Sequence, residues 1–320
     1  MTLSTSPADS RVRHTEHRIT VQAPARSVYE VIADVTGWPA IFTPTVHAER
    51  LEFDGAEERI RLWATANGEV KTWISRRVLD PERLRVEFRQ EVSQSPVAAM
   101  GGAWIFEERP DGGTDVLLTH DYTAVSDVPD AEEWIAKAVD RNSTVELAAL
   151  KAFVEPTAVG DPVLTFEDTV RIAAPAASVY EFLYRAESWR ELLPHVSRVV
   201  LDEPVPGIQR LEMDTTAPNG ATHTTASFRV ALEGDRIAYK QVVLPPLLTL
   251  HLGCWTITEA GDGGVAAVSR HTVRINPEKL SLLGEGTDLD AAKAYIRNAL
   301  STNSTTTLMH AKAHTEAAAS

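Results

Sequence analysis

Residues 23–30 read Ala-Pro-Ala-Arg-Ser-Val-Tyr-Glu, and residues 174–181 read Ala-Pro-Ala-Ala-Ser-Val-Tyr-Glu. Seven of these eight positions match at an offset of 151 residues. The same offset relates further pairs: Trp38 and Trp189, Gly102 and Gly253, Trp104 and Trp255, Gly112-Gly113 and Gly263-Gly264, and His120 and His271. Solenoid repeats have units of about 20–50 residues. A repeat this long therefore predicts two complete globular domains of the same fold.

Composition narrows the class of protein. The chain has 320 residues, with 31 basic and 45 acidic side chains and a net charge of −14. Nucleic-acid binding needs a basic face, so we expect no nucleic-acid partner. The single cysteine, Cys254, excludes a disulfide framework. Residues 1–18 lack an apolar signal core, and the longest apolar stretch, residues 242–250, is too short to span a membrane. We therefore expect a cytoplasmic protein without membrane association.

Each half repeats one order of elements. A first strand at 17–23 precedes a helix that begins near Pro24, since proline suits the first helical turn. Strands follow, separated by hairpin signals: Asn67-Gly68 and Asp111-Gly112-Gly113, then Asn219-Gly220 and Asp262-Gly263-Gly264. Long helical patterns close the halves at about 130–154 and 288–315. We expect an arm at 1–16, a first domain at 17–155, a linker at 156–163 and a second domain at 164–316.

The closing helix has a composition that predicts a hollow interior. A curved antiparallel sheet has one apolar face to cover, and in each half the long helix must cover it. Small residues at Ala138, Ala148 and Ala149 would leave space between that helix and the sheet. We therefore expect a cavity in each domain.

Three motifs make the chain similar to a known family. Trp38-Pro39, Trp73-Ile74-Ser75-Arg76-Arg77 and Asn142-Ser143-Thr144, which recurs as Asn303-Ser304-Thr305, resemble the di-domain aromatase/cyclases of bacterial type II polyketide synthases. The resemblance implies an α+β architecture of two helix-grip (START-like, Bet v 1-like) domains. It also implies cofactor-free, first-ring (C7–C12 type) aldol cyclisation and dehydration of a poly-β-ketone on an acyl carrier protein, with other synthase components as further partners.

Trp73, Ser75 and Arg77 share one face of a predicted strand, because strand side chains alternate. The resemblance implies that Arg77 binds and polarises a substrate carbonyl. A guanidinium in a dry pocket would stabilise the enolate that forms during aldol closure. Spacing alone leaves open the alternative that Val70, Ile74 and Val78 form the buried face and that the arginine is solvated. The second half keeps this row as Ser227 and Arg229, with Thr225 in place of the tryptophan.

His120 shares its strand face with Val116, Leu118 and Tyr122, which predicts that it points inward. A histidine there can take the acidic proton of a 1,3-diketone and later protonate a departing hydroxyl. A hydrogen-bonded core histidine is the alternative. Arg89 matches a second arginine of single-domain relatives and is a candidate for substrate binding, although its strand neighbours suggest a solvated face.

The remaining candidates extend the two expected pockets. For the first pocket they are the aromatic residues Trp38, Trp63, Trp73 and Trp104, which could equally be core packing, and the polar helix residues Asn142 and Ser143. The second pocket is expected to contain Arg229, Ser227, His271, Trp255, Asn303 and Ser304. His195, His223 and His271 have no ligand-like spacing, so we predict neither a metal nor a cofactor.

An acidic carrier protein would need a local basic patch on this acidic chain. Residues 76–89 hold five arginines against three acids, and residues 11–18 hold three against one. We therefore assign ring closure to the first domain and give the second either dehydration or an architectural role. A binding or transport module of the same fold is the rival function, and outward-facing Arg77 and His120 would favour it.

Overall fold

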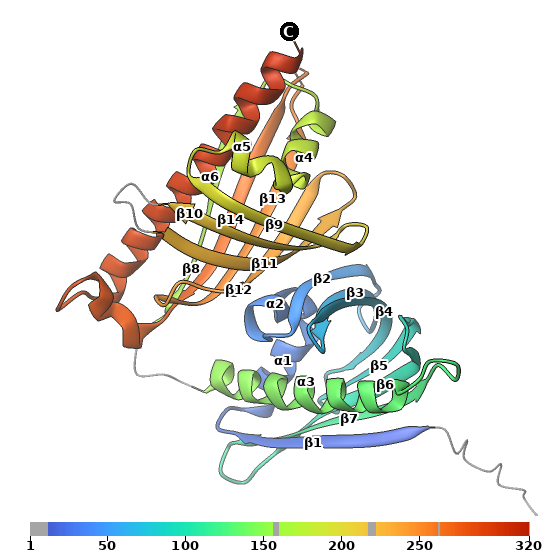
Figure 1. Ribbon diagram of the computed structural model, residues 1–320. Coiled ribbons are helices and arrows are strands. Elements are labelled where there is room, and N and C mark those ends of the chain that lie inside the picture. Colours follow the sequence, from blue (N-terminus) through green and yellow to red (C-terminus); the bar gives the residue numbers. More distant parts are fainter. Residues whose placement is uncertain (1–11, 156–159, 217–221, 262, 320) are drawn as a thin grey trace, which may run out of the picture. The chain divides into compact units, whose positions relative to one another are not determined.

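The structure is a computed structural model that describes residues 12–155, 160–216, 222–261 and 263–319. The chain divides into two compact units, Met1–Pro156 and Thr157–Ser320. Each unit contains one seven-stranded antiparallel sheet among its described residues and one long C-terminal helix (Figure 1). The prediction of two tandem helix-grip domains is confirmed.

The first domain wraps its sheet around its last helix. Its strands lie in the order β1-β7-β6-β5-β4-β3-β2, so the first and last strands in sequence pair with each other. The elements are β1 (Arg13–Val21), α1 (Ala25–Ala33), η1 (Val35–Gly37), α2 (Trp38–Ile41), β2 (Thr45–Phe53), β3 (Glu57–Ala66), β4 (Glu69–Asp80), β5 (Arg85–Val92), β6 (Val97–Glu108), β7 (Thr114–Ala124) and α3 (Ala131–Val154).

Local sequence explains why these elements begin and end where they do. Pro24 has extended backbone geometry and precedes the first turn of α1, as expected for a helix start. Asn67 and Gly68 join β3 to β4 with φ angles of 52° and 90°, which is the geometry of the tight hairpin turn that this pair favours. The corresponding turn residues Asn219 and Gly220, and Asp262 in the last hairpin, lie outside the described residues.

One end of α3 anchors the helix to the sheet. Leu147 and Leu150 on α3 pack with Val116 and Leu118 of β7 in a buried cluster that also contains α1. Full burial of such side chains contributes about 1.5–3 kcal/mol each. The other half of α3 carries Ala138, Asn142 and Ser143 toward the sheet, and this part of the interior is not filled by side chains.

The second domain repeats this topology with strand order β8-β14-β13-β12-β11-β10-β9. Its elements are β8 (Val163–Ile172), α4 (Ala176–Tyr184), η2 (Ala186–Ser188), α5 (Trp189–Leu192), β9 (Val196–Val205), β10 (Ile208–Thr216), β11 (Thr222–Leu232), β12 (Arg236–Val243), β13 (Leu248–Glu259), β14 (Val265–Ile275), η3 (Pro277–Leu283) and α6 (Leu289–Ala319). The added helix η3 packs on Leu247 and Leu248.

The expected boundaries need small corrections. Strand β1 begins at Arg13, which pairs with Tyr122, so the expected arm at 1–16 is too long by several residues. Residues 1–11 lie outside the described residues. Strand β8 begins at Val163, which is inside the expected linker at 156–163. Helix α6 continues to Ala319, beyond the expected end of the second domain at 316. Within the described ranges, we find no helix with the length and apolarity that crossing a membrane requires.

Candidate active site

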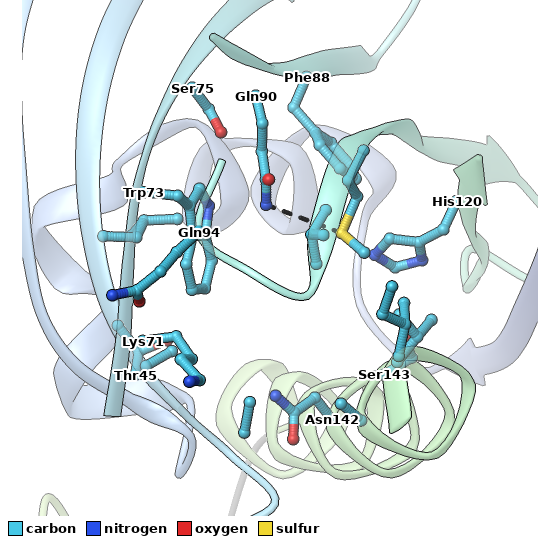
Figure 2. A pocket seen from close by; sticks show the side chains of 18 of the residues that line it. Thr45, Lys71, Trp73, Ser75, Phe88, Gln90, Gln94, His120, Asn142 and Ser143 are labelled. Atoms are coloured by element: carbon cyan, nitrogen blue, oxygen red, sulfur yellow. Dashed lines mark hydrogen bonds between the residues drawn. The ribbon is translucent and has the colours of Figure 1, made fainter. Parts of the chain in front are cut away.

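A cavity of about 160 Å³ lies in the first domain between α3 and the sheet (Figure 2). A single water needs about 10–15 Å³ of such space, so the cavity can hold an organic guest. The wall contributed by α3 includes Ile135, Ala138 and Asn142. The predicted cavity beneath the closing helix is present in this domain, but of the three small residues that predicted it only Ala138 lines it: Ala148 is exposed and Ala149 packs against the core cluster.

Trp73, Ser75 and Arg77 all line the cavity from β4. Ser75 and Arg77 are buried, whereas Val78, on the opposite face of the strand, is 39% exposed. The alternative in which the arginine is solvated is therefore wrong. Figure 2 shows Trp73 and Ser75 facing the same open space as His120.

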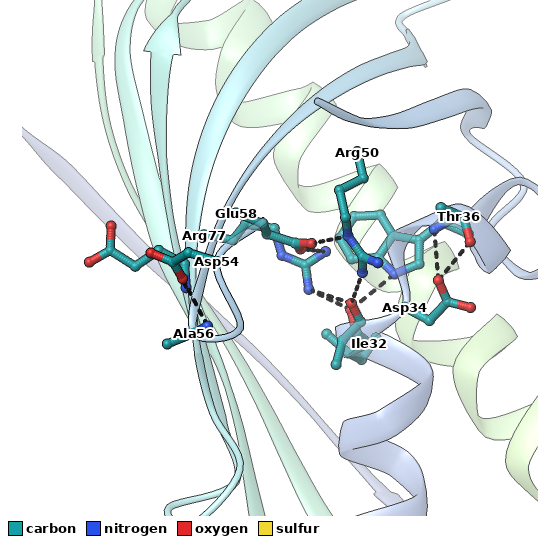
Figure 3. Close-up of polar contacts among 11 residues, drawn as sticks. Ile32, Asp34, Thr36, Arg50, Asp54, Ala56, Glu58 and Arg77 are labelled. Atoms are coloured by element: carbon teal, nitrogen blue, oxygen red, sulfur yellow. Dashed lines mark hydrogen bonds and ion pairs between the residues drawn. The ribbon is translucent and has the colours of Figure 1, made fainter. Parts of the chain in front are cut away.

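The guanidinium of Arg77 is held by the end of α1 (Figure 3). Its Nη2 donates to the carbonyl oxygen of Ile32 at 2.6 Å and of Ala33 at 3.5 Å. A helix C-terminus has exposed carbonyl oxygens and the negative end of the helix dipole, so it favours a cation. Trp38 lies against the same group, with Arg77 Cζ 5.0 Å from its ring centre.

A buried acid completes this arrangement. Glu58 on β3 lies with one oxygen 3.3 Å from Arg77 Nη1 and the other 2.5 Å from Arg50 Nε. Burial lowers the pKa of Arg77 to about 10, and Glu58 opposes that shift. Arg77 thus stays charged at neutral pH, but one of its donors is committed to the fold. Its direct contact with a substrate oxygen stays a prediction.

His120 lines the cavity from β7, and its ring centre lies 5.5 Å from that of Phe88. Burial lowers its pKa to about 4. The imidazole is therefore neutral at pH 7 and can accept a proton. Its Nδ1 atom has no hydrogen-bond partner among the described residues.

Glu146 is a cavity residue that the sequence reasoning missed. Burial raises its pKa to about 8, with no basic side chain opposing the shift. The carboxyl group is therefore mostly protonated at neutral pH and can donate a proton. A signal was available, because Glu146 follows Asn142 by four residues and so lies on the same face of α3.

Lys71 was also missed, although it precedes Trp73 by two residues and shares its strand face. It lines the cavity, forms an ion pair with Glu69 at 2.9 Å and lies 5.6 Å from the ring centre of Trp134.

The other expected residues divide into two groups. Trp38, Trp104, Asn142 and Ser143 line the cavity, and Asn142 donates to the carbonyl of Thr65, which joins α3 to β3. Two expectations are wrong. Trp63 lies opposite His47, on the other face of the sheet from the cavity-lining Leu62, and its ring centre is 5.3 Å from that of the histidine, with the two rings tilted by 43°.

Arg89 is the second wrong expectation. Its side chain is 56% exposed and forms an ion pair with Asp121. Strand alternation places it on the solvent face of β5, because Phe88 next to it lines the cavity. It does not bind a guest in this cavity.

The second domain keeps the arginine but changes its surroundings. Arg229 is buried and donates to the carbonyls of Leu183 and Tyr184, which match Ile32 and Ala33 of the first domain. Gln209 occupies the position of Glu58, donates to Tyr184 O and Glu203, and leaves Arg229 without the buried carboxylate that Arg77 has.

Side chains of β12 to β14 make a hydrogen-bonded cluster in the second domain. His271 Nδ1 lies 2.9 Å from His251 Nε2, and its Nε2 lies 3.0 Å from Ser269 Oγ. Tyr239 is 3.5 Å from the same Nδ1 atom. At the repeat offset these replace Phe88, Met100 and Leu118, which line the first cavity. Both nitrogens of His271 therefore have partners, unlike those of His120.

The other residues expected in a second pocket are packed in the core, hydrogen-bonded within the domain or exposed. Trp255 packs in the main core, Ser227 is buried, and Ser304 donates to the carbonyl of Ser301. Asn303 is exposed, which contradicts its expected inward position. The helix there presents Ser304 and Thr307 to the interior instead.

The expected basic patch at 76–89 is also wrong, because each of its five arginines pairs with an acid of the same chain. Those pairs are Arg76 with Glu57 and Glu91, Arg77 with Glu58, Arg83 with Asp80, Arg85 with Glu87, and Arg89 with Asp121. The surface there is electrically balanced.

Both halves of the chain match family models described as polyketide cyclase/dehydrase and lipid transport. Residues 21–146 and residues 163–306 each match a family of this description. The chain is 45% identical to the granaticin polyketide synthase bifunctional cyclase/dehydratase of Streptomyces violaceoruber, over 94% of this chain and 93% of that protein. It therefore belongs to the polyketide cyclase/dehydrase family.

Further relatives specify the subclass. The actinorhodin polyketide synthase bifunctional cyclase/dehydratase of Streptomyces coelicolor is 45% identical over 96% of this chain and 97% of that protein. The crystal structure of the di-domain ARO/CYC BexL from the BE-7585A biosynthetic pathway superposes with a TM-score of 0.84 at 50% identity, covering 95% of this chain and 99% of that one. The chain is a di-domain member of the aromatase/cyclase class, as its motifs predicted.

Proposed function

We propose that this protein is a bifunctional polyketide cyclase/dehydratase whose first domain closes and aromatises the first ring of a carrier-bound poly-β-ketone. The observation that carries this proposal is the pairing of a neutral His120 and a protonated Glu146 on one cavity. Environments that keep a base and an acid uncharged at the same pH are suited to proton transfer. The relatives named above carry the same activity in their names.

In this mechanism the cavity folds the chain so that one methylene lies beside its target carbonyl, which is a proximity effect. His120 takes the methylene proton, the carbanion attacks the carbonyl to close the ring, and the imidazolium returns the proton to the resulting alkoxide. For the dehydration, His120 takes a second C–H proton from the new ring. Glu146 then protonates the hydroxyl that leaves as water. Arg77, near the cavity wall, contributes a positive field that favours the developing enolate. Regiochemistry of the C7–C12 type belongs to the proposal.

The rival transport function has less support. A carrier pocket is mostly apolar with few convergent charges. Lys71, Arg77, His120 and Glu146 all line this cavity. The second domain is assigned an architectural role, since both ring nitrogens of its histidine are committed to neighbouring groups.

Reconstitution tests the proposal directly. A ketosynthase pair, a carrier protein and the substrates should give mis-cyclised products alone and a single first-ring aromatic product when this protein is added. The product mixture is resolved by liquid chromatography and mass spectrometry. An unchanged mixture, together with retention of polyketide by the protein, would support transport instead.

The Glu146→Gln variant should remove the basic limb of the pH–rate profile. Wild-type turnover should fall as pH rises through about 8, where Glu146 loses its proton. Because the folded pKa is above the ordinary 4.5, the native state holds a proton that the unfolded chain releases, so stability declines between about pH 4.5 and about pH 8. Rate profiles and urea denaturation from pH 5 to 9 would check both effects, and glutamine should abolish both. A retained limb would assign the acid to another group.

A further inference from the structure

Three buried polar atoms at one edge of the first domain have no hydrogen-bond partner among the described residues. They are Thr15 Oγ1, His17 Nδ1 and His120 Nδ1. Buried polar atoms in native proteins are nearly always paired with protein or with ordered water. Three such atoms close together therefore point to a common, non-protein partner.

The strand register brings these side chains together. In the β1–β7 pair, Thr15 lies opposite His120 and His17 lies opposite Leu118. Alternation puts Thr15 and His17 on the same face of the sheet as His120, the face toward α3. Diagonal neighbours of this kind lie roughly 7–8 Å apart, within reach of long side chains. The charge of His17 also contributes to lowering the pKa of His120, as expected for nearby imidazoles.

His17 continues from this cluster to the surface. Its Nε2 lies 3.2 Å from Asp140 Oδ1 on α3. The side chain of His17 is 14% exposed and that of Asp140 is 80% exposed. One imidazole thus connects a buried position beside the cavity with a carboxylate in bulk solvent.

We propose that a water bound by Thr15, His17 and His120 completes a proton path from the cavity to Asp140. A buried water typically makes about three hydrogen bonds to such groups. The polarity is consistent throughout: His120 Nδ1–H donates to the water, the water donates to His17 Nδ1, and His17 Nε2–H donates to Asp140. This tautomer leaves the Nε2 lone pair of His120 free to accept a substrate proton.

The role of this path in turnover rests on the proposed function. During dehydration the substrate C–H bond breaks, its electron pair forms the C=C bond, and its proton goes to His120 Nε2. The C–O bond breaks as Glu146 donates a proton, and water leaves. After this step His120 is an imidazolium and Glu146 is a carboxylate. The imidazolium releases its Nδ1 proton through His17, which leaves the Nε2–H tautomer of His120. The cycle closes when the Glu146 carboxylate accepts that Nε2 proton through water in the cavity and the path returns a proton to Nδ1, so the Nδ1–H tautomer and the protonated acid are both restored.

The second domain provides an internal comparison. Phe166 and Asp168 occupy the positions of Thr15 and His17 at the repeat offset, and Phe166 stacks on His271 at 5.1 Å. Ser269 and His251 take both nitrogens of His271. The described part of this domain therefore does not repeat the path, in agreement with an interior that has no proton to exchange.

Two-bond ¹⁵N–¹H NMR of the histidine-labelled full chain tests the path without using activity. His120 should be in the Nδ1–H tautomer, and His17→Phe should shift its population toward Nε2–H. His14→Phe is the matched control, since His14 is an exposed neighbour on the opposite face of β1 and should leave His120 unchanged. Asp140→Asn, at an exposed site that does not threaten folding, should alter the His17 resonances.

Turnover provides the second readout. In His17→Phe, kcat should fall about tenfold with KM unchanged, because proton release slows while substrate binding does not change. The path is overturned if wild-type His120 is in the Nε2–H tautomer. It is also overturned if the His120 signals are the same in His17→Phe as in the wild type. If His17→Phe shifts the tautomer population of His120 but leaves kcat unchanged, the path has no role in turnover. A wild-type protein without cyclase activity would refute the proposed function and leave the NMR result standing.

Discussion

Replacing His120 with leucine should lower ring-closure turnover by about 10²–10⁴-fold, the usual contribution of a positioned general base. The substitution keeps an apolar side chain of similar size in the cavity wall, so the fold should persist. Initial rates of aromatic product formation, measured with a reconstituted synthase, would give the effect. Circular dichroism would confirm that the variant is folded.

The matched control is His271→Leu in the second domain. It removes the equivalent histidine from a cluster whose members bind one another, so it should cost stability and leave turnover within about twofold of wild type. Equal losses of turnover in both variants would instead indicate two working sites. Loss in His271→Leu alone would reverse the assignment of the domains.

The Arg77→Met variant should lower the free energy of unfolding by about 3–5 kcal/mol, the range for removing one partner of a buried ion pair. The variant deprives Glu58 of a charge partner 3.3 Å away and takes the strongest donor from the last carbonyls of α1. Urea denaturation followed by tryptophan fluorescence would measure the change, with separate transitions fitted for the two domains.

Arg229→Met provides the comparison for this stability effect. It removes the same carbonyl contacts, but Gln209 stands where the first domain has Glu58. The expected loss is about 1.5–3 kcal/mol, the range for hydrogen bonds that involve a charged group. The double variant Arg77→Met/Glu58→Leu should recover part of the first loss. Equal losses in the two single variants would show that the buried carboxylate adds nothing.

The sequence was sufficient for the fold because the evidence for it is repeated and local. The duplicated Ala-Pro-Ala segment, the Asn-Gly turn and the long apolar pattern each describe neighbouring residues, and each occurs twice or has a fixed geometry. The cavity beneath α3 was predicted from three small residues, of which only Ala138 lines it. The start of β1 was missed because its residues Arg13 to Glu16 are polar and gain order only by pairing with β7.

The site was harder to predict, since its chemistry depends on which groups meet across the fold. Strand alternation put Ser75 and Arg77 on one face and the family resemblance favoured that face as the inner one, but neither could show that Ile32 and Glu58 would meet the guanidinium. Trp63 and Arg89 were misplaced for the opposite reason: aromatic character and family likeness were given more weight than the parity of their strands.

Glu146 shows the remaining limit. A glutamate on a helix is ordinarily a solvent-facing residue, and only the three-dimensional surroundings reveal that it is enclosed and keeps its proton. In the second domain, likewise, no sequence rule predicted that Tyr239 and His251 would both lie beside His271 Nδ1.

The arginine contact at the end of the first helix has a consequence for evolution and engineering. Both copies have it, although only the first has a buried acid paired with that arginine, so the contact is the feature that the duplicated domains share. The inner wall therefore differs between the two copies while this anchor is the same in both. An engineer who wishes to enlarge the interior of the carboxy-terminal copy should preserve Arg229 and begin by shortening Tyr239 and His251.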